Sequence, residues 1–287
     1  MKILVLGAGG MAGHTVALYF QGRGYDVTAF TRRPFPYCKN VVGDAADLER
    51  LKKTVLDDYD IIVNCIGILN QNAESNQAEA VFLNSFLPHW LAETLADTPA
   101  KLIHLSTDCV FSGRTGPYCE NSLKDGTSFY SRSKALGEID DQKNLTFRTS
   151  IVGPDLNPDG IGLFNWFMKQ HGVVHGYTRV IWTGVTTLTL AQAMEQSITE
   201  HLTGIYHLVN QTSISKFHLL QLFNRYMKNG GQEIVPDDHV SNDKSLVNRR
   251  TDFQFEVPSY ETMVRGMRDL IASHRCLYPH YFFGGRV

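Results

Sequence analysis

A short apolar run followed at once by clustered glycines constrains the fold of this chain more than any other feature. Residues 2–6, KILVL, lack alternating polar positions, as expected of a strand buried on both faces. Gly7, Gly10 and Gly13 then follow at three-residue spacing in LGAGGMAGH, where a helical pattern begins. Glycines permit a tight turn and close backbone approach, and a helix N-terminus offers unpaired N–H groups to a phosphate. The sequence therefore predicts a dinucleotide-binding turn that includes these glycines and the adjacent Met11.

Strand-like and helix-like segments alternate over the first 150 residues. Apolar runs that fit buried strands recur at residues 26–30, 60–67, 101–106 and 145–150, and helical periodicity marks residues 11–22, 46–56, 78–95 and 128–139. Such alternation predicts a parallel sheet with right-handed crossovers and helices on both faces. The expected fold class is therefore α/β, a doubly wound parallel sheet of the Rossmann type.

The end of the second predicted strand bears on the choice of dinucleotide. In an NAD site an acidic residue there holds the ribose 2′-hydroxyl, whereas this strand runs into Thr31, Arg32 and Arg33. A guanidinium holds a 2′-phosphate through paired, charge-assisted hydrogen bonds. NADPH is therefore the expected cofactor. NADH stays open, because the two arginines could also belong to a solvated loop.

The regular alternation of predicted strands and helices ends at about residue 155. Helical segments at residues 162–170, 186–202, 215–228 and 259–275 are separated by short strands such as 205–209. We expect an NADP-binding Rossmann domain at residues 1–155 and a smaller, mixed α/β substrate-binding region at residues 156–287. Whether the second region returns strands or helices to the first stays open. The crevice between the two is the expected ligand site.

Composition excludes several classes of function. The formal net charge is −2, from 27 basic and 29 acidic side chains, which argues against a nucleic-acid-binding surface. No stretch approaches the roughly 18 apolar residues of a membrane helix, and the opening apolar run is too short for a signal peptide. Five cysteines without a Cys-x-x-Cys pair favour free thiols, and no cluster has metal-ligand spacing. We expect a cytoplasmic protein without a metal.

A tyrosine and a lysine stand four residues apart in FYSRSKALGE. On a helix Tyr130 and Lys134 share one face. Ser106 and Thr107 follow a predicted buried strand, at the sheet edge where doubly wound folds bind ligands. The combination suits carbonyl reduction: Thr107 holds the carbonyl oxygen, Tyr130 donates a proton, and Lys134 lowers the tyrosine pKa and binds the nicotinamide ribose. These three residues are the predicted catalytic set of an NADP-dependent oxidoreductase acting on a CH–OH/C=O pair.

Taken together, these motifs resemble the extended short-chain dehydrogenases/reductases, and among them the dTDP-4-dehydrorhamnose reductase family. The resemblance is carried by GAGGMAG, STDCVFSG, YSRSKALGE and FRTSIVG, at residues 7–13, 106–113, 130–138 and 147–153. It covers residues 1–155 well and the rest more weakly. It implies NADPH-dependent reduction of a 4-keto nucleotide-diphosphosugar.

The resemblance also implies further contacts. The cofactor would meet Asp44 and Ala45 at the adenine, Cys65, Ile66 and Gly67 along its length, and Arg148 to Ser150 at the nicotinamide. The substrate would meet Thr107, Asp108 and Ile151. Two departures from the family pattern leave the sugar open: Cys109 stands for the usual tyrosine, and Ile151 for a tryptophan at the sugar.

Two adjacent arginines, Arg249 and Arg250, lie before the final predicted helix in NRRTDF. Paired guanidinium groups would bind a diphosphate well. Solvated surface charge is an equally good explanation of the pair. Both arginines are candidate substrate-binding residues, and surface charge stays open as the alternative.

Two other functions stay open. A sugar-nucleotide epimerase or dehydratase would retain NAD, and the missing acid after the second strand weighs against it. A non-catalytic, NADP-binding regulatory subunit of another enzyme is favoured by the changes at Cys109 and Ile151. The sequence also leaves open the sugar, the nucleotide (dTDP or UDP), the stereochemistry of reduction and a homodimeric assembly.

Overall fold

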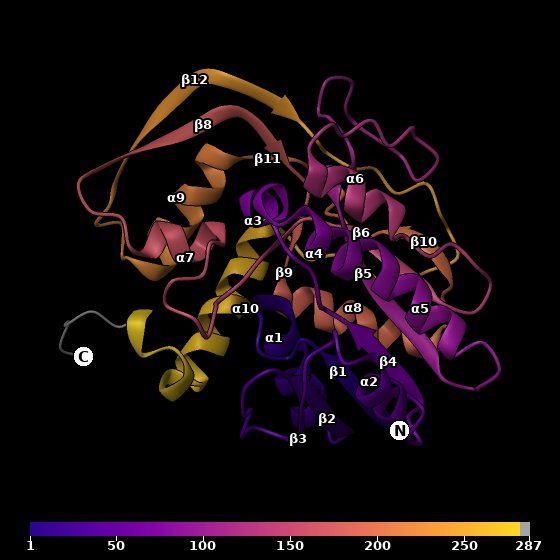
Figure 1. Cartoon of the computed structure of the whole chain (residues 1–287). Coiled ribbons are helices and arrows are strands. Elements are labelled where there is room, and N and C mark those ends of the chain that lie inside the picture. The colour runs from indigo at the N-terminus through magenta and orange to yellow at the C-terminus, as the bar shows by residue number, and fades with distance from the viewer. Residues whose placement is uncertain (282–287) are drawn as a thin grey trace.

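Seven parallel strands form the central sheet of the computed structural model, which describes residues 1–281 (Figure 1). They are ordered β10-β6-β5-β4-β1-β2-β3. Their bounds are β1 (Lys2–Leu6), β2 (Asp26–Thr31), β3 (Lys39–Val42), β4 (Ile61–Asn64), β5 (Lys101–Thr107), β6 (Leu145–Thr149) and β10 (Gly204–His207). The chain order reverses between β1 and β4, the place where doubly wound sheets bind ligands. The predicted fold class is confirmed.

The side chains of β1 alternate between two apolar clusters. Ile3 and Val5 pack with α1 (Met11–Gly22) and α8 (Thr187–Thr199) on one face of the sheet. Leu4 and Leu6 pack on the other face with two further helices, α2 (Leu48–Val55) and α5 (Leu87–Thr94). All four side chains are fully buried. Coverage of both faces is the physical reason that KILVL contains no polar alternation.

The single helix predicted for residues 78–95 is divided into three segments. After α3 (Asn70–Ser75), α4 (Gln77–Val81) leads into a π-helical turn at Phe82–Phe86 and then into α5. Pro88 has no N–H to donate to the Asn84 carbonyl four residues earlier, which favours the wider turn. The Asn84 side chain bonds the backbone N–H and C=O of Ile68 and the Ser133 hydroxyl. This turn therefore fixes the loop after β4 against the helix that carries Tyr130.

The second half of the chain forms a smaller sheet, seen as two long arching strands in Figure 1. β8 (Val173–Trp182) pairs with β12 (Glu233–Asp243) in parallel and with β11 (Ile214–Ser215) antiparallel. α9 (Lys216–Met227) packs on this sheet, and α7 (Leu163–Met168) and α10 (Tyr260–Ser273) lie nearby. β7 (Ile151–Val152) pairs with β9 (Val185–Thr186). Strands β3, β8 and β12 were not predicted from the sequence.

Two elements of the second half belong structurally to the first. β10 extends the central sheet next to β6, and α8 packs against α1. The two halves thus share one apolar core, which runs from β1 and α1 to α9 and α10.

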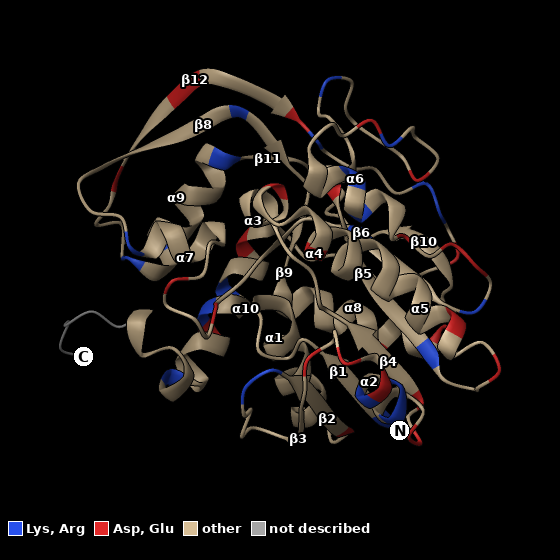
Figure 2. Cartoon of the chain, in the orientation of Figure 1, with Lys and Arg blue, Asp and Glu red and all other residues tan. Residues whose placement is uncertain are grey.

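Charges of both signs are interspersed along both regions (Figure 2). All five cysteines are free. Among residues 1–281, no helix has the length and apolar character needed to cross a membrane.

Candidate active site

The glycine-rich turn has the shape that a dinucleotide requires. Gly7 has a φ of +79°, and a Cβ added at Gly13 would lie 2.3 Å from the Gly7 carbonyl oxygen. Side chains at these two positions would therefore strain or block the turn. At the start of α1, Gly10 provides no side-chain cap, and the first turn contains no acidic residue. The N-terminus of α1 thus fits the negative charge of a pyrophosphate.

The predicted adenosine contacts lie at the neighbouring strand ends. Arg32 and Arg33 are exposed directly after β2. The Thr31 hydroxyl donates to the Arg33 carbonyl at 2.6 Å, which folds the arginines into a tight turn. Asp44 is exposed and Ala45 buried, after β3. The segment after β3 is linked to the end of β2, because the Gly43 N–H donates to the Thr31 carbonyl at 2.8 Å.

The loop after β4 packs against the glycine turn. A Cβ on Gly7 would lie within 3.2 Å of Ile66 and of the Cys65 carbonyl carbon, and Gly67 is exposed next to them. Burial raises the pKa of the Cys65 thiol to about 12, and the nearby Lys134 charge lowers it. The predicted cofactor residues after β1, β2, β3 and β4 therefore share the carboxyl edge of the sheet.

Thr107 and Tyr130 meet at the end of β5. Thr107 caps a short 3-10 turn, accepting from the Cys109 N–H at 3.1 Å, and Tyr130 lies on α6 (Phe129–Leu136), which Ser128 caps. Both residues are buried. Burial raises the pKa of the Tyr130 phenol, the charge of Cys109 adds to that effect, and a hydrogen bond with the Thr107 side chain lowers it in part. The net result is a phenol that stays protonated at neutral pH.

Lys134 lies on the same helix but bonds away from the phenol. Its Nζ donates to the Leu105 carbonyl at 2.6 Å and lies 3.4 Å from Nε2 of His104. Burial lowers the pKa of Lys134 to about 8, and the Glu138 and Cys65 charges raise it against that effect. That Lys134 lowers the tyrosine pKa stays a prediction.

Arg148 corrects one prediction, because it is part of the core rather than a border of the nicotinamide. Its side chain is 1% exposed. Nε and Nη2 donate to the two carboxylate oxygens of Glu138 at 2.8 and 2.7 Å, and Nη1 lies 2.7 Å from Nε2 of His207. The Ser106 hydroxyl donates to the same carboxylate at 2.6 Å. α6 ends at Leu136, before the predicted end at residue 139, so Glu138 leaves the helix and reaches this pair.

Arg250, the second arginine of NRRTDF, does not join the other predicted residues. Nη1 of Arg250 donates to the carbonyls of Thr203 and Ile205, at the amino end of β10, and the guanidinium pairs with Asp252. The predicted site lies at the opposite, carboxyl edge of the sheet, so Arg250 cannot bind a diphosphate there. Arg249 is exposed, and its N–H donates to Glu120 at 3.3 Å.

The remaining substrate-side candidates lie beside Thr107. Asp108 accepts from the Thr107 hydroxyl at 3.2 Å, and Ile151 is half-buried on β7, opposite Val185. The charges of Asp108 and Cys109 raise the pKa of Lys216, a residue of the second half that the sequence analysis missed. Its one sequence signal is a lysine directly after Ser215, a favourable helix cap.

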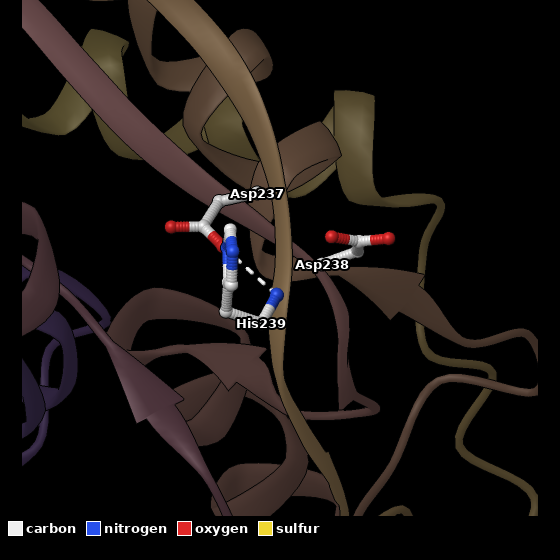
Figure 3. Close-up of side chains that lie close together, drawn as sticks. All are labelled: Asp237, Asp238 and His239. Carbon is white, nitrogen blue, oxygen red and sulfur yellow. Dashed lines mark hydrogen bonds and ion pairs between the residues drawn. The ribbon is translucent and has the colours of Figure 1, made fainter.

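One group in residues 1–281 has ligand atoms close enough for a metal, and it consists of Asp237, Asp238 and His239 on β12 (Figure 3). Asp238 and His239 are exposed. Nδ1 of His239 already bonds Asp237 at 2.9 Å, and the two side chains face each other in Figure 3. We assign no metal to this group.

Comparisons with known proteins agree with the architecture. Residues 1–248 match the family model described as RmlD substrate binding domain. A crystal structure of dTDP-4-dehydrorhamnose reductase from Bacillus anthracis in complex with NADP superposes with a TM-score of 0.78. It covers 93% of this chain and 98% of that chain at 21% identity. At that identity the similarity shows the fold.

Two curated relatives each match about half of the chain. The dTDP-4-dehydrorhamnose reductase of Mycobacterium tuberculosis (strain ATCC 25618 / H37Rv) is 32% identical over 143 residues, which are 48% of this chain and 44% of that protein. Methionine adenosyltransferase 2 subunit beta of Xenopus laevis is 30% identical over 143 residues, 48% of this chain and 41% of that protein. The matched segments thus span less than half the length of these relatives.

Proposed function

The chain belongs to the RmlD substrate binding domain family, and from this premise we propose that it is an NADPH-dependent reductase of a 4-keto nucleotide-diphosphosugar. The observation that carries the proposal is the contact between the Tyr130 phenol and the Thr107 side chain at the carboxyl end of β5. A protonated phenol beside a second hydroxyl suits a carbonyl oxygen that must gain a proton. The B. anthracis and M. tuberculosis relatives, both dTDP-4-dehydrorhamnose reductases, support the same substrate class.

The residues at the sheet edge fit NADPH. The first turn of α1 would hold the pyrophosphate, with Gly7, Gly10, Met11 and Gly13 around it. Arg32 and Arg33 would hold the 2′-phosphate, with Asp44 and Ala45 at the adenine. Cys65, Ile66 and Gly67 would lie along the cofactor, and Lys134 would bond the ribose of the nicotinamide. Bound NADPH would supply a hydride to the carbonyl carbon.

In the proposed reaction the chain itself supplies orientation and one proton. The Thr107 hydroxyl would turn from Asp108 to donate to the carbonyl oxygen of the sugar and so fix its position. Tyr130 transfers its phenolic proton to that oxygen as the carbon gains hydride, so C=O becomes CH–OH. The raised pKa of Tyr130 keeps the proton on the phenol until the oxygen becomes basic enough to take it. Asp108 and Ile151 would border the sugar.

We further place the protein among the short-chain dehydrogenases/reductases and in the cytoplasm, with a Rossmann domain at residues 1–155 and a substrate-binding region at residues 156–287. A homodimer is compatible with the proposal. The five free thiols support a reducing compartment.

A second candidate, an NADP-binding regulatory subunit, is favoured by one relative. The Xenopus laevis protein is a subunit of methionine adenosyltransferase. In that case the chain would bind NADPH and would turn over no keto sugar nucleotide. The third candidate, an epimerase or dehydratase with retained NAD, is disfavoured by the exposed Arg32 and Arg33 after β2.

A single assay separates these candidates. The purified protein is mixed with NADPH and, one at a time, with dTDP- and UDP-linked 4-keto-6-deoxy sugars, and NADPH absorbance is followed. Oxidation that depends on one keto sugar supports the reductase. NADPH binding without oxidation in the whole panel rejects it in favour of the regulatory subunit, and tightly held NAD in the purified protein points to the epimerase or dehydratase.

A further inference from the structure

Lys216 is a cation from the second half of the chain that reaches the end of β5. It is the first residue of α9, and the preceding Ser215 accepts from the His218 N–H to cap that helix. β11 pairs with β8 so that Ile214 lies opposite Trp182. This register brings the ammonium over the indole, with Nζ at 5.1 Å from the centre of the Trp182 ring. The position of Lys216 is therefore set by a helix cap, a strand pair and a cation–π contact.

The Trp182 ring beneath Lys216 lies at the carboxyl edge of the sheet, because a Cβ on Gly184 would lie within 2.6 Å of that ring and 2.0 Å from the carbonyl oxygen of Ser150, directly after β6. Burial lowers the pKa of Lys216 to about 8, and the charges of Asp108 and Cys109 raise it against that effect. Asp108 and Cys109 directly follow Thr107 in the chain. Lys244 is a second cation near Cys109, whose pKa it lowers. Within residues 1–281, Lys216 Nζ makes no hydrogen bond or ion pair, so its N–H donors have no protein partner there besides the Trp182 ring.

We propose that Lys216 and Asp108 together bind a hydroxyl group of the sugar ring, next to the carbonyl held by Thr107 and Tyr130. This inference rests on the proposed reductase function and specifies how its substrate is recognised. A hydroxyl accepts from the ammonium and donates to the carboxylate, so it satisfies both charges. A phosphate in the same place would approach the Asp108 carboxylate with like charge. Lys216 and Asp108 would therefore recognise the sugar ring and not the diphosphate.

The test measures binding of sugar and nucleotide separately. Wild type and Lys216→Met are titrated with dTDP-glucose, UDP-glucose, dTDP, UDP and NADPH by calorimetry, and KM and kcat are measured with the keto sugar nucleotide that wild type reduces. Methionine keeps the length of the chain over Trp182 and removes the charge. We expect about ten- to hundredfold weaker binding of the nucleotide sugar. KM should rise by a similar factor, with kcat, the dTDP or UDP affinity and the NADPH affinity unchanged.

Two further variants complete the design. Lys228→Met is the matched control, because Lys228 Nζ also lies over an aromatic ring, at 5.0 Å from Phe167, but past the far end of α9. It should leave every constant unchanged. Lys216→Arg keeps the charge and should recover part of the lost nucleotide-sugar affinity.

The outcomes separate this inference from the proposed function. Equal loss of affinity for the nucleoside diphosphate and the nucleotide sugar would overturn it, because that pattern marks a phosphate contact. If the dissociation constants and KM of Lys216→Met equal those of an active wild type, the inference about Lys216 is overturned and the proposed function is not. A wild type that neither binds nucleotide sugars nor oxidises NADPH would reject the proposed function and this inference together.

Discussion

Arg148 and Lys134 are two buried cations near the same sheet edge, and their surroundings are opposite. Arg148 shares two hydrogen bonds with Glu138, at 2.7 and 2.8 Å, and both side chains are almost fully buried. Lys134 is 5% exposed, and its shortest bond is to the Leu105 carbonyl. Among the described residues no carboxylate forms an ion pair with Lys134. One buried charge is neutralised by its partner, and the other is kept buried without one.

The pKa values of the two regions follow from this difference. Burial alone raises the pKa of Glu138, but hydrogen bonds from Arg148 and Ser106 outweigh it and hold the pKa below the ordinary value. Burial of Lys134 meets no comparable compensation, and its pKa falls to about 8. A paired buried charge serves the architecture, whereas a buried charge with a perturbed pKa is typical of a functional site. The comparison indicates a structural role for Arg148 and supports the proposed binding role of Lys134.

Breaking the paired cation should have the largest effect on stability. Arg148→Met leaves the Glu138 carboxylate buried without its partner, so we expect the free energy of unfolding to fall by about 3 to 5 kcal/mol. Urea denaturation followed by circular dichroism measures it. The double variant Arg148→Met, Glu138→Leu should recover part of the loss, because no charge is then left unpaired. A loss below about 1 kcal/mol would contradict a structural role for the pair.

Removing the proposed acid should act on turnover and spare the fold. Tyr130→Phe keeps the ring and deletes the proton, so kcat should fall by about 10²- to 10⁴-fold. The urea midpoint should stay near that of wild type. Initial rates of NADPH oxidation at saturating substrate give the comparison. Full turnover in this variant would remove Tyr130 from the catalytic set.

Removing Lys134, which has no ion-pair partner among the described residues, should change the free energy of unfolding in the opposite direction to removing Arg148. Lys134→Met deletes a buried charge that has no counter-ion, so stability should stay equal or rise by up to about 2 kcal/mol. The same change should raise the KM for NADPH about tenfold, because a charge-assisted bond to the ribose is lost. A stability loss as large as that of Arg148→Met would erase the distinction between the two cations.

The Lys134 pKa also predicts a pH dependence. The folded value of about 8 lies below the ordinary 10.5, so the folded state binds this proton less tightly than the unfolded state. Stability should therefore rise as pH increases from about 8 toward 10.5, and the rise should be absent in Lys134→Met. The affinity for NADPH should fall above pH 8 as the ammonium loses its charge. Stability and cofactor titrations at a series of pH values test both, and a flat NADPH affinity to pH 9.5 would argue against a bond from the charged form.

The exposed arginines after β2 form a third class of cation, and their substitution should have the smallest effect on stability. Arg32→Ala and Arg33→Ala should change stability by less than about 0.5 kcal/mol, because both side chains lie at the surface. The preference for NADPH over NADH should fall about tenfold if either holds the 2′-phosphate. Kd values for the two cofactors measure it. An unchanged preference in the double variant would turn the assignment toward NADH.

Local patterns predicted much of the sheet and part of the candidate site. KILVL followed by glycines indicated β1, the turn and α1, because φ above zero at Gly7 and contact at Gly13 are properties of those residues themselves. The spacing of Tyr130 and Lys134 put both on α6. The strands β8 and β12 escaped detection, because both are partly exposed, Gly176 interrupts β8, and β12 contains Pro236 and many polar residues. The π-helical turn at Phe82–Phe86 depends on Pro88 and on contact between Gly137 and the Asn84 carbonyl.

The sequence by itself determined most elements of the central sheet and the sheet edge at which a ligand is predicted, because periodicity and glycine geometry act within a few residues. Only the tertiary structure decided the partner of each charge. Arg148, Arg250, Lys134 and Lys216 are all cations in the sequence. In the structure Arg148 is paired with Glu138, Arg250 is bound at the amino end of β10, and the pKa values of Lys134 and Lys216 are lowered by burial. The physical reason is that the energy of a buried charge depends on groups far away in the chain, which folding alone brings within a few ångströms.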